Sequence, residues 1–336
     1  MDDKITLDDI ARLSGVSRSA ASRAINQRPG VRADVRERVN RIADQLEFRP
    51  NRAARNLASG RSSVIGLIIT SDDLRVDPYG AAIIQAVGRA AATRDLGLML
   101  HLADTTPGRV VQHILRDGLI DGLLISSVAL GSWVDELLDA PLPTVLLGTH
   151  PTRRDVVSVD VENVESSCLA VEHLFDQGCR RIGAITGPMD RADARDRVEG
   201  YRLAHARCGR PVDEALVVAG DFGRMSGIAA GARLFDLDVD GIFASNDEMA
   251  VGAIWAGAWR GRSVPDDVLV VGFDGTMVDE FVDPTITSVA QPFDDIAVAG
   301  VELLEALVAG DTAARSVSIA PELVRGGSSI RRPAGS

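Results

Sequence analysis

Short apolar segments alternate with helical segments from Ser63 onward, and this alternation limits the possible folds more than any other feature. The helical segments include 80–93, 164–177 and 248–259. Such alternation predicts parallel sheets covered by helices on both faces. Eight strands are too many for one small sheet, so we expect two doubly wound lobes with ligand groups at the carboxyl ends of strands. The expected strands are 64–69, 98–102, 122–125, 144–147, 182–185, 216–218, 241–244 and 269–272.

The first 60 residues contain almost no strand signal and instead predict short helices. The segment 7–13 places apolar residues on one helix face, and Gly15 can adopt the positive φ that a sharp turn requires. Ser17 stands at the N-cap position of a second helix, 18–26. Apolar residues at spacings of four, three and four predict a third helix over about 33–46. A small all-α head therefore precedes an α/β body.

The segment 51–58 has the cap and the end of a further short helix, Asn51 and Gly60. Isolated helices shorter than about 12–15 residues are only marginally stable in water. We therefore expect this segment to become helical only against a partner.

The charge of the chain is unevenly distributed. Residues 1–60 contain one lysine and eleven arginines against eight acids, a net charge of +4, so the remainder of a chain with charge −12 carries −16. A basic head on an acidic body favours a head that binds a polyanion such as nucleic acid.

Two residue counts restrict chemistry and location. Lys4 is the only lysine, which excludes P-loop phosphate binding, Schiff-base chemistry and a kinase ATP site. The three cysteines, Cys168, Cys179 and Cys208, are widely spaced, which disfavours both disulfides and a thiolate metal site. The sequence also contains no apolar run long enough for a membrane anchor and no secretory signal. We expect a cytoplasmic protein.

The head carries two specific motifs. The stretch LDDIARLSGVSRSAASRAIN begins at Leu7, and FRPNRAARNLASG begins at Phe48. Both closely resemble the DNA-binding head of the lactose repressor (LacI/GalR) family, and the resemblance continues through the body to IAPELVRGGS at 319–328. It implies a helix-turn-helix head whose second helix enters the major groove of operator DNA, followed by a hinge helix and a two-lobed body.

The resemblance assigns DNA-binding roles. It implies base contacts by Arg18, Ser19 and Arg23, and arginine can bond bidentately to guanine O6 and N7. Phosphate or packing roles fall to Thr6, Ser17, Ser22 and Asn26.

In the hinge, the resemblance makes Leu57 a wedge in the minor groove. Asn51, Arg52 and Arg55 are placed for phosphate or groove contact.

The sequence departs from the family pattern at two places in the head. Ala20-Ala21 replaces a common Thr-Val pair, which removes a hydroxyl and a methyl contact to DNA. Arg32 stands where the third helix usually has a Ser or Thr cap.

The resemblance also divides the chain. It gives a head over 1–50, a hinge over 51–61 and a ligand-binding and dimerisation body over 62–336, whose lobes three chain crossings join. The first lobe covers about 62–160 and 292–320, and the second about 161–291 and 321–330.

The effector is expected between the lobes. Arg197 matches the family's ligand arginine, and Asn246, Asp247 and Asp274 match its polar ligand positions. A carboxylate and a guanidinium together can bind adjacent sugar hydroxyls. The other candidates are Asp77 in an acidic loop, Tyr79, Phe222 and Gln291.

Several alternatives stay open at this point. Asn246 and Asp274 could instead cap helices, because Asn and Asp do so routinely. The ligand could be a neutral sugar or an amine-bearing molecule, and a purine or nucleoside is the alternative to a sugar. The low aromatic content, 4%, favours a sugar because purine sites use stacking rings.

Three functional classes compete. The leading hypothesis is a homodimeric transcriptional repressor that binds palindromic operator DNA and responds to a small molecule, with no cofactor or metal. A doubly wound enzyme lacks support, since no G-x-G-x-x-G, H-E-x-x-H or G-x-S-x-G motif is present. A sugar-binding protein that does not bind DNA would not need the basic head. The ending SSIRRPAGS contains no leucine-rich tetramerisation helix, which favours a dimer.

Overall fold

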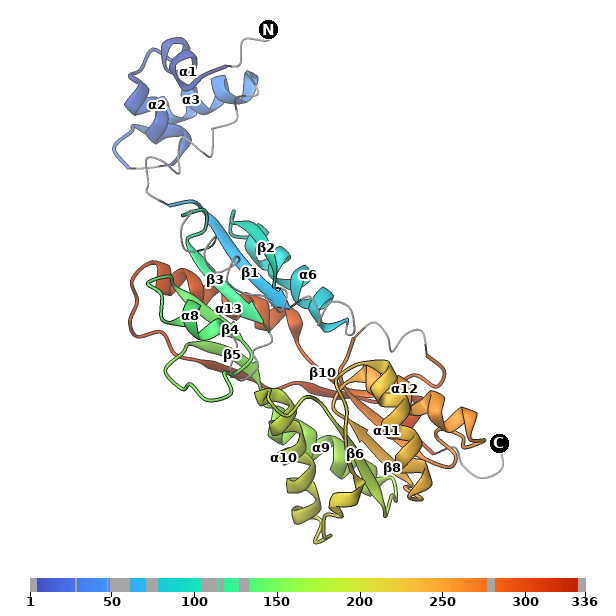
Figure 1. Ribbon diagram of the computed structural model, residues 1–336. Coiled ribbons are helices and arrows are strands. Elements are labelled where there is room, and N and C mark those ends of the chain that lie inside the picture. Colours follow the sequence, from blue (N-terminus) through green and yellow to red (C-terminus); the bar gives the residue numbers. More distant parts are fainter. Residues whose placement is uncertain are drawn as a thin grey trace. The chain divides into compact units, whose positions relative to one another are not determined.

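A computed structural model describes residues 5–27, 29–46, 48, 61–70, 78–103, 114, 118–126, 133–276 and 282–331 (Figure 1). The chain divides into two compact units, Met1–Ser62 and Ser63–Ser336. We call the first unit the head and the second the body, and describe each by itself.

Three short helices form the head: α1 (Leu7–Leu13), α2 (Arg18–Ile25) and α3 (Ala33–Gln45). Gly15 has φ +64°, as the predicted turn requires. Ile10, Ala24 and Val39, one from each helix, are fully buried and form the centre of a small core. Arg32 precedes α3 without a side-chain cap, as its residue type predicts. The three predicted helices of the head are confirmed.

Two six-stranded sheets form the body, and every pairing is parallel except β10 with β12. The first sheet has the order β11 (Val317–Ile319), β5 (Ser158–Val161), β4 (Thr144–Leu147), β3 (Gly122–Ser126), β1 (Val64–Thr70), β2 (Gly97–Ala103). The second has the order β12 (Glu322–Val324), β10 (Thr287–Ala290), β9 (Leu269–Asp274), β8 (Gly241–Ala244), β6 (Ile182–Thr186), β7 (Val217–Ala219).

Helices cover both faces of each sheet (Figure 1). Neighbouring residues of one strand point to opposite faces. Val270 of β9 accordingly packs with α11 and α12, whereas Val271 packs with α9 and α10. In the first sheet, Leu67 packs with α6 and α13, and Ile68 packs with α8. The helices are α6 (Tyr79–Ala92), α8 (Val134–Leu138), α9 (Asn163–Asp176), α10 (Ala192–Arg207), α11 (Arg224–Asp236), α12 (Asp247–Trp259) and α13 (Phe293–Val308).

The chain passes between the two lobes three times: after β5, after β10 and after β11. The first and third passages lie side by side, because the amide of Glu162 donates to the carbonyl of Ile319 at 3.0 Å. The predicted two-lobed fold is therefore confirmed, with the carboxyl ends of several strands next to these passages.

Four strands were not predicted: β5, β10, β11 and β12. Each has only three or four residues and contains a polar or charged residue, so none shows a continuous apolar run. The predicted strand 216–218 is shifted, since Leu216 ends a short 3-10 helix, η1 (Glu214–Leu216), and the strand begins at Val217. In the described part of the chain, no helix is long and apolar enough to cross a membrane.

Candidate functional site

The start of α2 carries the predicted recognition residues of the head. Ser17 is the N-cap, and its hydroxyl accepts a hydrogen bond from the amide of Ala20 at 3.1 Å. Arg18 follows at the first helical position with its side chain 71% exposed, and its only described ion pair is a 3.4 Å contact with exposed Asp8. An exposed pair of this kind contributes little stability, so Arg18 can exchange it for another partner.

Ser19 and Arg23 lie one turn apart on α2, and the Arg23 guanidinium donates to the Ser19 hydroxyl at 2.9 Å. Asn26 instead donates to the carbonyl of Ser22 at 2.8 Å, which closes the end of the helix. The structure therefore brings together two of the three predicted base-contacting side chains, Ser19 and Arg23, and gives Asn26 a local structural bond.

Thr6 has a structural role at the start of α1. Its hydroxyl accepts from the amide of Asp9 at 3.3 Å, and the Asp9 carboxylate accepts from the amide of Thr6 at 3.1 Å. This reciprocal pair is a capping box. Hydrogen bonds from Thr6 hold the pKa of Asp9 below its usual value.

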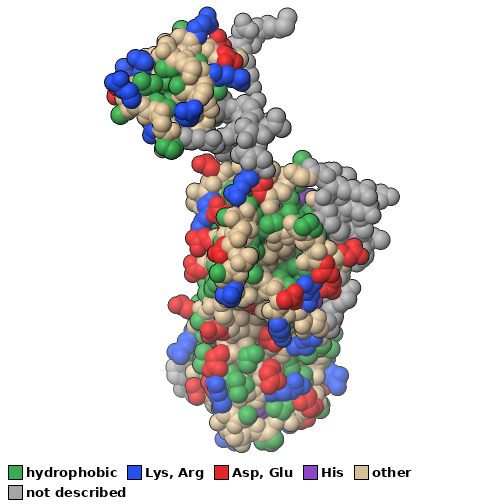
Figure 2. Space-filling view, turned by 90° about the vertical axis from the view of Figure 1, so that its left-hand side faces the viewer, with side chains coloured by type: hydrophobic (Ala, Val, Ile, Leu, Met, Phe, Trp, Pro, Cys, Tyr) green, Lys and Arg blue, Asp and Glu red, His purple; other side chains and the backbone are tan. Residues whose placement is uncertain are grey.

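Basic side chains lie in several separate groups on the visible surface of the head in Figure 2. On the visible face of the body, acidic and basic side chains are interspersed (Figure 2). The predicted hinge residues Asn51, Arg52, Arg55 and Leu57 lie outside the described residues.

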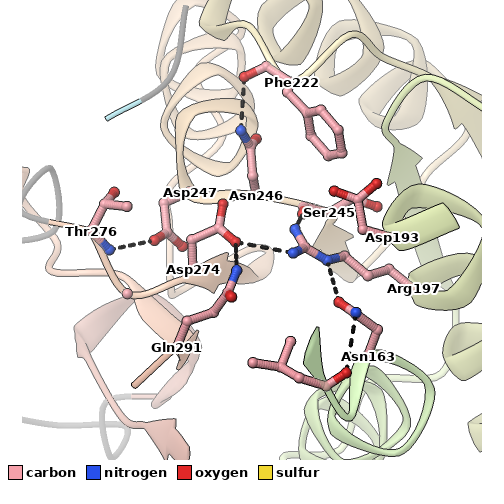
Figure 3. Close-up of polar contacts among 12 residues, drawn as sticks. Asn163, Asp193, Arg197, Phe222, Ser245, Asn246, Asp247, Asp274, Thr276 and Gln291 are labelled. Atoms are coloured by element: carbon pink, nitrogen blue, oxygen red, sulfur yellow. Dashed lines mark hydrogen bonds and ion pairs between the residues drawn. The ribbon is translucent and has the colours of Figure 1, made fainter. Parts of the chain in front are cut away.

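Arg197 of α10 is the centre of the predicted effector site (Figure 3). Its Nη2 lies 3.2 Å from Asp274 Oδ1, its Nη1 donates to the carbonyl of Ser245 at 2.6 Å, and its Nε donates to Asn163 Oδ1 at 3.1 Å. The guanidinium carbon lies 3.7 Å from the centre of the Phe273 ring. Arg197 is therefore fixed in position by groups from three different segments: the end of β9, the residue after β8 and the start of α9.

Asp274 ends β9, and Gln291 follows β10. Gln291 donates to Asp274 Oδ1 at 2.6 Å, so this oxygen has two partners. Asp274 has φ +105°, a strained conformation for a residue other than glycine. Phe222, φ +67°, is the other buried residue of this kind among the described residues. Both were predicted effector residues, and strain of this kind often accompanies a functional site.

Asp160 and Asn163 belong to the site but were not predicted from the sequence. Asn163 is buried, and its amide nitrogen donates to Asp160 Oδ1 at 3.1 Å while its oxygen accepts from Arg197. Thr149 donates to the other oxygen of Asp160 at 2.6 Å. Neither residue was recognised as lying at the carboxyl end of a strand, because β5, which contains Asp160 and precedes Asn163, was itself not predicted. Asn163 thus links the first passage between the lobes to Arg197.

Arg191 and Asp193, also not predicted, precede and begin α10 and form an ion pair of 2.8 Å. The Arg191 guanidinium lies 4.9 Å from the centre of the Phe222 ring. Phe222 itself is buried against Gly187, where an added Cβ would collide with the ring. The ring of Phe222, predicted to contact the effector, is therefore already in contact with the guanidinium of Arg191.

Asn246 and Asp247 are engaged in local structure. Asn246 is the N-cap of α12, accepts from the amide of Met249 at 3.0 Å and donates to the carbonyl of Phe222 at 2.8 Å. Asp247 accepts from the Ser288 hydroxyl at 2.6 Å and from the amide of Thr276 at 3.0 Å. Of the two residues that could have been helix caps, Asn246 is one. Asp274 is instead the last residue of a strand.

Tyr79 begins α6 and packs edge-to-face on Phe293, with ring centres 5.6 Å apart. Burial raises the pKa of Tyr79, and the charges of Asp274 and Asp160 act in the same direction. Asp77 lies outside the described residues.

The carboxylates of the site differ in their pKa values. Burial raises the pKa of Asp274 to about 6, against the opposing effect of Arg197. Burial also raises the pKa of Asp160. For Asp193, Arg191 and Arg197 together outweigh the burial that would raise its pKa, and lower it to about 2. We call Asp160, Asn163, Arg191, Asp193, Arg197, Asp274 and Gln291 the Arg197 cluster.

The part of the chain that the structure describes contains no group of three or more His, Cys, Asp and Glu residues arranged to hold a metal ion. The chemistry of the Arg197 cluster is that of hydrogen bonding, with carboxylate acceptors and guanidinium donors that suit the hydroxyl groups of a polyol.

Comparison with known proteins covers both units. The model of the lacI family of bacterial regulatory proteins matches residues 6–51, and that of a periplasmic binding protein-like domain matches residues 171–329. The HTH-type transcriptional regulator CelR of Thermobifida fusca is 34% identical over 319 residues, 91% of this chain and 93% of that protein. The ribose operon repressor of Escherichia coli K12 is 30% identical, over 89% of this chain and 92% of that protein.

Solved structures of transcriptional regulators are also similar to this chain in fold and sequence. The complex of a transcriptional regulator CelR with cellobiose has a TM-score of 0.76 and 32% identity, covering 96% of this chain and 99% of that one. The lac repressor dimer bound to operator and an anti-inducer has a TM-score of 0.80 and 25% identity, covering 98% of this chain and 100% of that one. On this similarity over nearly its whole length, and on its helix-turn-helix head and two-lobed body, the chain belongs to the lacI family of bacterial regulatory proteins.

Proposed function

We propose that this protein is a homodimeric transcriptional repressor whose affinity for operator DNA is controlled by a sugar or sugar derivative. The observation that carries the proposal is the combination, in one chain, of a helix-turn-helix with Arg18 exposed at the start of α2 and a buried polar cluster beside the passages between two lobes. The proposed divisions are a head over 1–50, a hinge over 51–61 and a body over 62–336.

In the head, α2 enters the major groove. Arg18, Ser19 and Arg23 contact bases, while Ser17 and Thr6 hold the starts of their helices and contact phosphates. Ser22 and Asn26 hold the end of α2. Arg52, Arg55 and Asn51 contact the backbone or groove at the hinge, and Leu57 wedges the central base step.

In the body, the effector binds at the Arg197 cluster. Arg197 and Asp274 bind its hydroxyl groups, Gln291 positions Asp274, and Phe222 and Tyr79 form apolar walls. Asn246 and Asp247 support the site through α12, and Asp77 contributes from the segment that precedes α6. A sugar is supported by the CelR complex with cellobiose, a structure that shares this fold.

The control of DNA binding follows from where the cluster lies. Asn163 belongs to the first passage between the lobes and Gln291 to the second, and both are bonded to the Arg197–Asp274 pair. A ligand that breaks or replaces these bonds changes the relative stability of two lobe arrangements. The lobe movement then alters the spacing of the two hinge helices, and so their binding to DNA.

A dimer is proposed because a palindromic operator has two half-sites. The lac repressor structure is a dimer on its operator. We assign the chain no catalytic role and no cofactor, and place it in the cytoplasm, where its DNA target would be.

The test is selection of bound sequences from random double-stranded DNA with the full chain, followed by fluorescence anisotropy on the selected site. We expect a palindrome, affinity that falls with salt concentration, and release or tightening on addition of one sugar. A chain that binds all sequences equally, at every salt concentration, would contradict the proposal.

A further inference from the structure

The starting point is the charge balance inside the Arg197 cluster. The cluster contains three carboxylates and two guanidinium groups. The carboxylates belong to Asp160, Asp193 and Asp274, and the guanidinium groups to Arg191 and Arg197. Both guanidinium groups already face carboxylates: Arg191 pairs with Asp193, and Arg197 with Asp274. An incoming anion would therefore have to compete for cations that the protein has already neutralised.

Both burial and mutual repulsion act on the acids of the cluster. The pKa values of Asp160 and Asp274 are both raised, chiefly by burial, and the charge of Asp193 raises each of them further. A further negative charge in this environment adds both desolvation and repulsion.

The same groups have acceptor capacity for hydroxyl groups. Both described hydrogen bonds to Asp274 go to Oδ1, which leaves Oδ2 as an acceptor within the described part of the site. Asp193 accepts from Arg191 and from the amide of Ala194, and an ionised carboxylate can accept about four hydrogen bonds. The hydroxyl of Ser245 is buried with no hydrogen-bond partner among the described residues, and it lies on the residue whose carbonyl binds Arg197.

We infer that the effector of this protein is a polyol that carries no negative charge, and that Asp160 and Asp193 make the site reject anionic sugars such as sugar phosphates and sugar acids. Ionised Asp193 contributes a fixed negative charge beside Arg197. Asp160, on the opposite lobe, accepts hydrogen bonds from Thr149, Asn163 and the amide of Val161, as a carboxylate does, and contributes a second negative charge. The inference rests on the proposed function, since it specifies the ligand of the same site.

The test uses matched sugars and measures binding alone. The full chain is titrated by calorimetry with glucose, galactose, mannose, ribose and cellobiose, and with glucose 6-phosphate, mannose 6-phosphate, ribose 5-phosphate, glucuronate and galacturonate. We expect at least one neutral sugar to bind at least tenfold more tightly than its phosphate or acid derivative. An anion that binds as tightly as its neutral parent overturns the inference, and so does an absence of binding across the whole panel.

Variants test the assigned residues. Asp193→Asn and Asp160→Asn should each reduce the preference for the neutral sugar over its anionic derivative at least fivefold. The matched control is Glu199→Gln on the exposed side of α10, which removes the same charge and should leave the preference unchanged. An unchanged preference in both Asp variants, with melting temperatures like that of the unaltered protein, overturns the role of these residues. Loss of preference in Glu199→Gln shows a nonspecific charge effect and overturns it too.

Failure of the inference and failure of the proposed function give different results. A chain that binds its operator and responds to a sugar phosphate keeps the function and loses the inference. A chain that binds neutral sugars but no specific DNA keeps the inference and loses the function.

Discussion

The guanidinium of Arg197 lies 3.2 Å from the carboxylate of Asp274, and both side chains are almost completely buried, at 4% and 3% exposure. Among the ion pairs between described residues, no other is so completely removed from water. Buried pairs contribute little net stability, because desolvation offsets much of the attraction. The pair is therefore better explained as part of a binding and switching site than as a stabilising element.

Removing one partner of this pair should be much more harmful than removing both. Arg197→Ala leaves Asp274 buried beside unpaired groups, and we expect a loss of about 3–5 kcal/mol in the free energy of unfolding. The double variant Arg197→Met, Asp274→Leu should recover part of that loss. Urea unfolding of Arg197→Met, Asp274→Leu, the double variant that combines them and the unaltered chain gives the coupling energy. Additive losses would show that the two side chains do not interact.

Arg18→Ala should weaken specific operator binding by about 1–3 kcal/mol and relax the preference at one base pair in each half-site. The reason is that Arg18 is exposed at the start of α2 and suits the two acceptors of guanine. The matched control is Arg41→Ala, an exposed arginine that pairs with Glu37 on α3. Binding is measured on operators varied one base at a time. An equal loss on all sequences would make Arg18 a phosphate contact.

Two helical glycines should respond oppositely to alanine. On α12, a Cβ at Gly252 would lie against the carbonyl oxygen of Arg224 and 2.7 Å from the amide nitrogen of Ile228, so Gly252→Ala must separate α11 and α12. We expect a loss of about 1–3 kcal/mol in unfolding free energy. On α6, a Cβ at Gly88 meets only Leu98, at 4.0 Å, and Gly88→Ala should gain up to about 1 kcal/mol. Denaturant midpoints compare the two, and stabilisation by both would contradict the close packing of α11 on α12.

The predictable part of the fold consists of elements whose own sequence carries a pattern. The head helices follow from spacing and caps, and strands such as β4 and β8 follow from continuous apolar runs. The short strand β5 gives no such signal, because its pairing with β4 and β11 comes from tertiary structure. Missing β5 also hid Asp160 and Asn163.

The candidate site was predictable to a similar degree. Arg197 and Asp274 were identified by motif, and the structure brings Asp274 into contact with both Arg197 and Gln291. Asn246 was proposed as a ligand position, yet its side-chain oxygen and nitrogen both form hydrogen bonds within the protein. The oxygen caps the start of α12, and the nitrogen donates to the carbonyl of Phe222. Sequence spacing cannot distinguish a ligand group from a helix cap, because both require the same short polar side chain at a strand end.

The raised pKa of Asp274 should be visible in the pH dependence of stability. The folded protein holds this proton more tightly than the unfolded chain, with a pKa of about 6 against 3.8. The group therefore contributes stability at low pH that is lost as pH rises from about 4 through 6. Asp274→Asn cannot lose this proton, so the unaltered chain should lose up to about 3 kcal/mol relative to Asp274→Asn between pH 4 and pH 7.

Asp193 provides the control of opposite sign. Its pKa, lowered to about 2 by Arg191 and Arg197, makes it contribute stability above about pH 4 that is lost as pH falls toward 2. The difference in unfolding free energy between the unaltered chain and Asp193→Asn should therefore move in favour of the unaltered chain as pH rises. That change should be nearly complete at pH 4. Urea unfolding of the three proteins at pH 3, 4, 5, 6 and 7 separates the two titrations. A stability difference between the unaltered chain and Asp274→Asn that stays constant from pH 4 to pH 7 would show that Asp274 is ionised throughout, and that Arg197 outweighs the effect of burial.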